Sequence, residues 1–176
     1  MSVLEEPPVP DEAYVETVAA DSFDAFFQRE YKAMVVLATA VSGSAEAAED
    51  IVQEAMLRAR RHWERVGAYD KPRLWVRRVT INLAISNRRR IASEAKARLA
   101  WWERREPDVQ PEPLDPDLLG ALRALPPRQR AAVSLHYLED RSTSEIADLL
   151  GCSESTARVH LHRGRNALAQ HLGATR

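Results

Sequence analysis

The chain has 176 residues, of which 45% are hydrophobic, 29% are charged and only 6% are aromatic. This length allows one domain or two small ones, and the abundance of Ala, Leu, Arg and Glu favours helices over strands. The formal net charge is −1, yet residues 1–57 carry 12 acidic and 2 basic side chains, whereas residues 58–92 carry 11 basic and 2 acidic. An acidic block suits a basic protein surface and a basic block suits phosphate, so we expect two kinds of partner.

The single cysteine, Cys152, excludes an internal disulfide and provides no paired-cysteine zinc motif. The first residues, "MSVLEEPPVPDEAYVE", are acidic and proline-rich, unlike a signal or transit peptide. The longest apolar run, residues 33–41, is too short to span a bilayer. We therefore expect a cytoplasmic protein without membrane insertion.

Residues 1–21 are expected to form a flexible N-terminal segment, and residues 22–92 a first helical domain. Its first helix should begin after Ser22 and stop at Gly43, its second should run from residue 44 to residue 66, and its third should cover residues 73–90 after the loop "GAYDKP". The apolar positions at helical spacing are Phe23, Phe27, Met34, Ala38 and Val41, then Ile51, Val52, Ala55, Met56, Ala59 and Trp63, then Trp75, Val76, Val79 and Leu83.

A linker is predicted over residues 93–116, because its end, "EPDVQPEPLDP", holds four prolines. Residues 117–176 then read as a second helical domain. A short leucine-rich helix precedes Pro126 and Pro127, and "RQRAAVSLHYLED" forms another helix. The predicted fold is all-α, with two small helical domains joined by a proline-rich linker.

The segment "RSTSEIADLLGCSESTARVHLHRGRNAL" predicts two helices meeting at a tight corner. Ser142 and Glu145 have the spacing of a capping box, and Gly151 follows the first helix where a left-handed residue is needed. Ser153 is placed to cap the second helix, whose residues Ala157, Leu161, Gly164 and Leu168 form one small and apolar stripe. This pattern is a helix-turn-helix.

The opposite face of the second helix carries polar and cationic side chains that could enter a DNA major groove, where Arg reads guanine and Arg or Ser holds phosphate. The alternative is a solvated surface helix. Metal ligation by His160 and His162 is disfavoured, because no thiolate or carboxylate ligand set accompanies them. The groove-facing candidates are Ser155, Arg158, Val159, His162, Arg163 and Arg165.

Three segments occur in the order and spacing found in bacterial sigma factors. The helix by which these proteins bind RNA polymerase is resembled by "SAEAAEDIVQEAMLRARRHW". The helix that faces the minus-ten promoter element is resembled by "PRLWVRRVTINLAISNRRR". "LPPRQRAAVSLHYLEDRSTSEIADLLGCSESTARVHLHRGRNAL" is similar to the domain that reads the minus-thirty-five element. Because only these two domains and a short linker are present, the chain resembles an extracytoplasmic-function (group 4) sigma factor over residues 22–92 and 116–170.

The resemblance implies that Asp50, Gln53, Glu54 and Leu57 contact the polymerase clamp. Asp50 and Glu54 lie one helical turn apart and would form an acidic ridge for a basic coiled coil. A plain solvated face is the second interpretation. A metal-binding carboxylate cluster is the third, although the Glu-x-x-His partner that such clusters use is absent.

On the third helix, small residues among arginines would let the helix lie close to DNA phosphate. The loop before it corresponds to the family's pocket for a flipped base. Trp75 could stack on an unpaired base, but it shares a face with Val79 and Leu83 and burial is favoured. The minus-ten candidates are Tyr69, Asp70 and Lys71 in the loop, and Arg73, Arg77, Arg78, Asn82 and Arg88 on the helix, with Thr80 and Ala84 on the same stripe.

The second helix of the corner, "TARVHLHRGR", departs from the family pattern T-V-x-S-R-L-x-R-A-R, and three of the departures matter. Val159 replaces a hydrogen-bonding Ser and could touch a thymine methyl group, His160 replaces an Arg, and Gly164 replaces Ala at a cost of roughly 1 kcal/mol in helix stability. The family's promoter preference therefore cannot be transferred to this chain.

The resemblance implies a sigma factor that binds core RNA polymerase through its clamp coiled coil and flap, recognises both promoter elements and promotes melting. It implies no enzyme activity and no cofactor or metal, and an anti-sigma factor is a partner that the family often has. Three rival classes are a stand-alone regulator of response-regulator type, a small helical enzyme or metal-binding bundle, and a protein-interaction scaffold. A regulator would show a βα receiver pattern, an enzyme would bring its carboxylates and histidines together, and a scaffold would lack salt-dependent DNA affinity.

Overall fold

The computed structural model describes residues 22–86 and 112–174, which form helices and the turns between them without any strand. This confirms the all-α prediction. The predicted N-terminal segment, Arg88 and most of the predicted linker lie outside the described residues. The helices are α1 (Phe23–Ser42), α2 (Ala45–Arg61), α3 (Trp63–Val66), α4 (Pro72–Ser86), α7 (Pro116–Arg123), α8 (Pro127–Glu139), α9 (Thr143–Leu150) and α10 (Glu154–Ala174).

Helix α1 begins and ends at the residues that the sequence predicts. The Ser22 hydroxyl accepts a hydrogen bond from the Ala25 N–H at 3.2 Å, which satisfies one of the donors left over in the first turn. Gly43 has φ +78°, and its N–H donates to the carbonyl of Thr39. The five predicted apolar positions of this helix are all buried.

The predicted second helix is in fact two helices, so this prediction was wrong. The chain leaves helical geometry at His62, where φ is −113° and the N–H donates to the carbonyl of Ala59, three residues back. The break lets Trp63 pack its ring against Phe23 and Phe26, with centroids 5.3 and 4.9 Å away. Aromatic packing of this kind outweighs the continuation of an exposed helix.

Helix α4 begins with Pro72, a residue suited to the first helical position because its missing N–H would have no partner there. Trp75, Val76, Val79 and Leu83 are buried, as their spacing predicts. Burial is therefore the correct interpretation of Trp75. Its indole N–H has no hydrogen-bond partner among the described residues.

The helix-turn-helix of residues 142–174 has the predicted geometry. Ser142 and Glu145 form a reciprocal capping box, and Gly151 adopts the left-handed conformation with φ +61°. The Ser153 hydroxyl accepts from the N–H of Thr156 at 3.2 Å and thus caps α10. These local signals are enough to fix the corner.

Gly164 has a packing role that helix propensity does not reveal. A Cβ atom at this position would lie 2.6 Å from Cγ2 of Val133 and 3.0 Å from the carbonyl oxygen of Gln129. Helix α10 therefore crosses α8 too closely for any side chain at the crossing point. Glycine allows this approach in return for weaker intrinsic helix stability.

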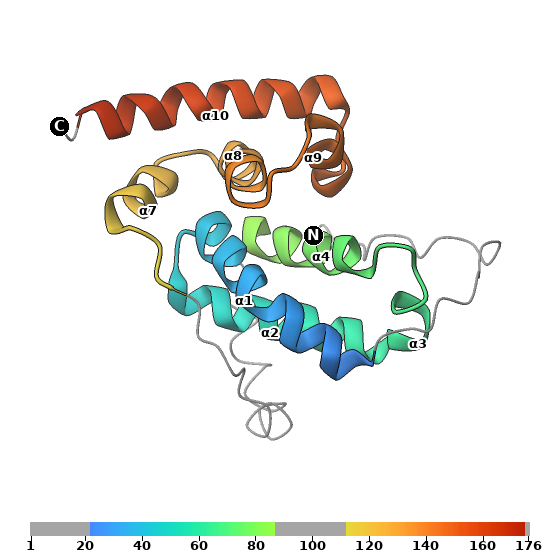
Figure 1. Ribbon diagram of the computed structural model, residues 1–176. Coiled ribbons are helices and arrows are strands. Elements are labelled where there is room, and N and C mark those ends of the chain that lie inside the picture. The colour runs from blue at the N-terminus through green and yellow to red at the C-terminus, as the bar shows by residue number, and fades with distance from the viewer. Residues whose placement is uncertain (1–21, 87–111, 175–176) are drawn as a thin grey trace.

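The two helical halves pack against each other in the structure (Figure 1). Helices α7 and α8 contact α1, and helices α8 and α9 contact α4, so one continuous apolar core includes residues from both halves. Helix α2 lies on the side of α1 and α4 that faces away from α8, α9 and α10 (Figure 1).

Candidate functional site

The predicted groove-facing surface of α10 is exposed. Its inner stripe, Ala157, Leu161 and Gly164, is buried against the rest of the domain, which turns the cationic face outward. Val159 stands out because it is apolar and still 44% exposed. The six predicted residues Ser155, Arg158, Val159, His162, Arg163 and Arg165 are all exposed.

Two contacts orient side chains on this face. Glu154 accepts from Nη2 of Arg158 at 2.8 Å, an exposed pair one helical turn apart. Asn166 Nδ2 lies 3.2 Å from Nε2 of His162. His160 belongs to a different face: it is half-buried, and burial followed by the charges of Arg128 and Arg163 lowers its pKa.

The predicted acidic ridge on α2 has a mixed character. Asp50, Gln53 and Leu57 are half-buried. Glu54 is only 8% exposed, and its carboxylate accepts from Nε of Arg58 at 2.8 Å. Asp50 therefore contributes most of the available negative charge at these four positions, because Arg58 largely neutralises Glu54.

In the loop before α4, Asp70 and Lys71 are exposed, and Tyr69 is half-buried. The Tyr69 hydroxyl is buried without a hydrogen-bond partner among the described residues. Burial raises the pKa of Tyr69, and the nearby charge of Arg65 opposes this effect. The three predicted loop residues thus lie on one turn between α3 and α4.

The predicted minus-ten stripe on α4 is only partly accessible. Arg73 is exposed, and Arg78 and Asn82 are half-buried. Arg77 is 6% exposed, and Thr80 and Ala84 are also buried. Helices α8 and α9 contact α4, and Glu139 of α8 pairs with Arg77, so the second domain covers this stripe at Arg77.

Arg77 is held by two carboxylates from opposite sides. Its Nη1 donates to Glu30 of α1 at 2.8 Å, and its Nε lies 2.7 and 2.6 Å from the two carboxylate oxygens of Glu139 at the end of α8. Burial alone lowers the pKa of Arg77, but the hydrogen bonds and charges of Glu139 and Glu30 outweigh it, and the pKa is raised.

Sequence reasoning did not find Glu30 or Glu139, because they lie 47 and 62 positions from Arg77 and belong to no motif. The network continues into the second domain. Arg141 lies 3.5 Å from Glu139 and donates to Glu145 at 2.9 Å.

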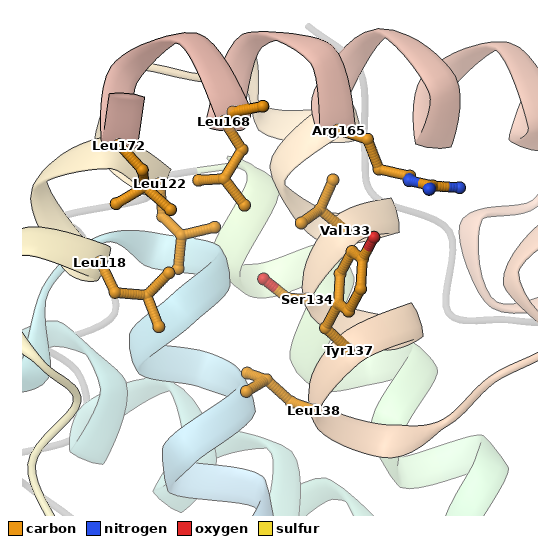
Figure 2. Close-up of a pocket in the computed structure, with 10 residues that line it drawn as sticks. Leu118, Leu122, Val133, Ser134, Tyr137, Leu138, Arg165, Leu168 and Leu172 are labelled. Atoms are coloured by element: carbon orange, nitrogen blue, oxygen red, sulfur yellow. The ribbon is translucent and has the colours of Figure 1, made fainter. Parts of the chain in front are cut away.

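An apolar groove of about 370 Å³ opens between α7, α8 and α10 (Figure 2). Tyr137, Leu138 and Leu172 on its walls are exposed. Figure 2 shows the Ser134 hydroxyl directed towards the leucines and the Arg165 guanidinium directed away from them. The lining residues are Leu118, Leu122, Val133, Ser134, Tyr137, Leu138, Arg165, Leu168, Ala169 and Leu172.

Sequence reasoning also missed this groove. The signal was the excess of large apolar side chains at positions 137, 138 and 172, beyond those that the domain core needs. The Ser134 hydroxyl at its base is 2% exposed as a residue and has no hydrogen-bond partner among the described residues. The groove is therefore apolar with a single unsatisfied polar atom.

Neither a metal site nor a membrane span is found in the part of the chain that the structure describes. No group of three or more His, Cys, Asp or Glu side chains there could hold a metal ion. None of its helices combines the length and the apolar character needed to cross a bilayer.

Comparison with known families covers both helical halves. The model for Sigma-70 region 2 matches residues 26–94, and the model for Sigma-70, region 4 matches residues 117–168. The first match contains α2, the loop and α4, and the second contains the groove helices and most of the helix-turn-helix.

Two relatives and one solved structure agree with these matches. The chain is 36% identical over 145 residues to the ECF RNA polymerase sigma factor SigL of Mycobacterium tuberculosis, covering 77% of this chain and 82% of SigL. It is 33% identical over 164 residues to the ECF RNA polymerase sigma factor SigE of Mycolicibacterium smegmatis, covering 88% of this chain but only 63% of SigE.

The fold is similar to that of the sigma factor RpoE of Bartonella quintana, solved in complex with the anti-sigma factor NepR. The TM-score is 0.58 at 22% identity, over 87% of this chain and 99% of RpoE. The family models and the similarity to SigL together show that the chain belongs to the ECF family of RNA polymerase sigma factors.

Proposed function

We propose that this chain directs core RNA polymerase to promoters that carry specific minus-thirty-five and minus-ten elements, and promotes opening of the duplex there. The observation that carries the proposal is the exposed cationic face of α10 within a region 4 domain. This face is positioned by the helix-turn-helix, whose first helix begins at a capping box and ends at the left-handed Gly151. Sigma factors are non-catalytic initiation factors, so the chain is not an enzyme. Its place of action is the cytoplasm, where the polymerase and the chromosome are found.

The minus-thirty-five element would be read by α10. A major groove admits one helix, and Arg158 at the N-terminal part of α10 can form a bidentate contact with guanine. Val159 offers a methyl group to thymine, which a serine at that position would not do. Ser155, His162, Arg163 and Arg165 would set the register through phosphate and base contacts.

The minus-ten element would be bound by α4 and the loop before it. Arg73, Arg78 and Asn82 retain accessible surface, and Arg88, outside the described residues, remains a candidate from the sequence alone. The loop residues Tyr69, Asp70 and Lys71 are our candidates for holding a base that has left the stack. An unstacked base exposes its edge and faces, so such a loop can bind it and favour the open duplex.

Two surfaces would hold the polymerase. Asp50 and its neighbours Gln53, Glu54 and Leu57 on α2 are assigned to the clamp coiled coil, since an acidic ridge with an apolar member suits a basic helix pair. The groove on region 4 is assigned to the polymerase flap, because apolar grooves of this kind accept the apolar face of a helix. Asp50, Gln53 and Leu57 of the ridge are half-buried, and Tyr137, Leu138 and Leu172 of the groove are exposed.

The proposal is tested by transcription in vitro with purified core polymerase on fragments of the source genome. We expect start sites that core polymerase alone does not use, and a promoter affinity that requires core polymerase. A chain that bound its promoter equally well without polymerase would instead be a stand-alone regulator. A complete lack of new start sites would refute the proposal.

A further inference from the structure

The contact between the two domains contains a buried charged group whose partners come from both domains. Arg77 of α4 lies between Glu30 of α1, in its own domain, and Glu139 of α8, in the other domain. The Arg77 and Glu139 side chains are each 7% exposed. Glu30 holds Arg77 within its own domain, whereas Glu139 holds it across the interface. Breaking a buried ion pair is destabilising, so the pair with Glu139 favours one relative position of the two domains.

The same interface has a second polar contact at the end of α1. Nε of Arg123, the last residue of α7, donates to the carbonyl of Gly43, which closes α1. Nη1 of Arg130 lies 3.1 Å from where a Gly43 Cβ would be. The C-terminal end of a helix carries partial negative charge and favours cations.

These two arginines also repel each other. Burial, followed by the charge of Arg123, lowers the pKa of Arg130. Both cations belong to region 4, and its docking places them at the carbonyl end of α1. Burial of Arg130 there costs free energy, which the Arg77 and Gly43 contacts and the shared apolar core offset.

The closed arrangement covers a surface that the proposed function needs. Arg77, Thr80 and Ala84, in the middle of the minus-ten stripe, are buried. Arg78 Nη2 lies 3.4 Å from where a Gly151 Cβ would be, so region 4 also reaches the rim of the stripe. Because Glu139 of α8 holds Arg77 and α9 approaches Arg78, DNA could not contact α4 at these two arginines while region 4 is docked.

The spacing of the two promoter elements also indicates that the domains must separate before both elements can be bound. The two elements lie roughly 25 base pairs apart by their names, or ~85 Å along B-form DNA at 3.4 Å per base pair. In the structure α10 packs on α9 and α9 on α4, and two helix layers separate axes by about 20 Å.

We propose that region 4 docks on region 2 of the same chain as an intramolecular partner, held by Glu139 on Arg77, and thereby keeps the minus-ten surface of α4 closed until the domains separate. This inference rests on the proposed function for the identity of the α4 surface. Glu139 is the central residue: it touches no predicted DNA or polymerase contact other than Arg77. Arg77 itself has two exclusive uses, as an anchor for Glu139 or as a contact with DNA.

The test measures the distance between the domains in the full-length chain. Spin labels are placed on Ala33→Cys in α1 and Gln170→Cys in α10, both exposed, in a Cys152→Ser background. Double electron–electron resonance then compares Glu139→Gln with the unaltered residue at that position. Arg123→Ala tests the second contact, and Asp148→Asn, an exposed carboxylate on α9, is the matched charge control.

We expect one short, narrow distance distribution for the labelled parent and for Asp148→Asn. In Glu139→Gln and in Arg123→Ala, a large fraction of the molecules should show longer distances between the two labels. The far-UV circular dichroism spectrum should remain that of a helical protein. A parent that already shows the long distances would overturn the closed state. A Glu139→Gln chain that stays at the short distance would overturn the role of this pair.

A second measurement links closure to DNA access. The probe is a promoter fragment, opened over the minus-ten element, taken from the transcription experiment above. We expect the chain alone to bind it several-fold more tightly with Glu139→Gln than without, and Asp148→Asn to have no effect. If Glu139→Gln lengthens the distance between the labels but binds the fragment no more tightly than the unaltered chain, region 4 does not block the minus-ten surface.

The failure of the proposed function would look different. In that case the unaltered chain selects no start site with core polymerase, whereas the distance measurement still reports whether the domains are closed.

Discussion

Nε of Arg77 lies 2.6 Å from a carboxylate oxygen of Glu139, although the two residues are 62 positions apart and belong to different domains. This pair changes the meaning of the basic stripe on α4. A surface that the sequence marks for DNA is, in this structure, the anchor of an interdomain contact. The same guanidinium can serve both roles only in succession, because Glu139 and Glu30 hold its Nε and Nη1 and the side chain is buried.

Charge reversal at Asp50 is expected to weaken polymerase binding. Asp50→Lys places a cation where the ridge should meet a basic coiled coil, and a like-charge contact at an interface costs several kcal/mol, so we expect a loss of roughly tenfold or more in affinity. The measurement is a titration of labelled chain with core polymerase.

The matched control is Glu64→Lys, on the exposed surface of α3 outside the ridge. Glu54 is a poorer choice for reversal, because it is buried beside Arg58 and its loss would perturb folding. An Asp50→Lys chain that binds core polymerase as tightly as Glu64→Lys would refute the assignment of the ridge.

Removal of Arg158 is expected to reduce dependence on the minus-thirty-five element. Arg158→Ala deletes a candidate bidentate contact worth about 1–3 kcal/mol of discrimination. Transcription from templates with and without the upstream element should therefore become more nearly equal.

Gln170→Ala, an exposed substitution further along α10, should leave the discrimination unchanged. Unaltered preference for the element after Arg158→Ala would show that other side chains read it.

Gly164→Ala tests the close crossing of α10 and α8. Alanine improves helix propensity by roughly 1 kcal/mol, but its Cβ would lie 2.6 Å from Cγ2 of Val133. Overpacking of a core contact costs ~1–3 kcal/mol, so we expect a net loss of unfolding free energy in urea.

Gly120→Ala in α7 is the matched substitution, because a Cβ there meets nothing within 4 Å. It should raise stability by up to ~1 kcal/mol. If both substitutions stabilised the chain alike, the crossing of α8 and α10 would be looser than the structure indicates.

The capping box predicts a specific acid sensitivity. The backbone N–H of Ser142, then Arg141 and the Ser142 hydroxyl, lower the pKa of Glu145 from 4.5 to about 2. A carboxylate whose pKa is depressed on folding stabilises the fold above its unfolded pKa and loses that contribution as the pH falls through the folded value. The stabilisation should therefore be complete above about pH 4.5 and disappear towards pH 2.

Glu145→Gln should lower the unfolding free energy at pH 7 by ~1 kcal/mol or less, because Glu145 is partly exposed and screened. The difference from the parent should shrink when urea unfolding is repeated at pH 3. Glu64→Gln, on an exposed helix, serves as the control. A difference independent of pH would mean that the charge of Glu145 is not what stabilises α9.

Local signals in the sequence predicted most of the fold. Ser22, Gly43, Ser142 and Gly151 act on backbone groups within a few residues, so their effect can be read without knowledge of the tertiary structure. The apolar stripes were equally informative, because burial of a helix face depends on spacing along one element. The break at His62 was missed because its cause is the distant aromatic pair Phe23 and Phe26.

The candidate site was predictable only where it depends on residues of a single helix. The outward face of α10 follows from the stripe on its other side, and it is exposed as predicted. The state of Arg77 depends on Glu30 and Glu139, which no periodicity connects to it. The groove was missed for the same reason, since its walls come from three helices and only their packing reveals the space between them.

The exposed walls of the apolar groove set what could occupy it. Tyr137, Leu138 and Leu172 remain in contact with water, although each is large and mostly hydrocarbon. Withdrawal of such surface from water yields roughly 25 cal/mol per Å² and does not depend on direction. The groove should therefore hold an occupant by the shape and extent of its apolar face, and should accept different sequences that present the same face.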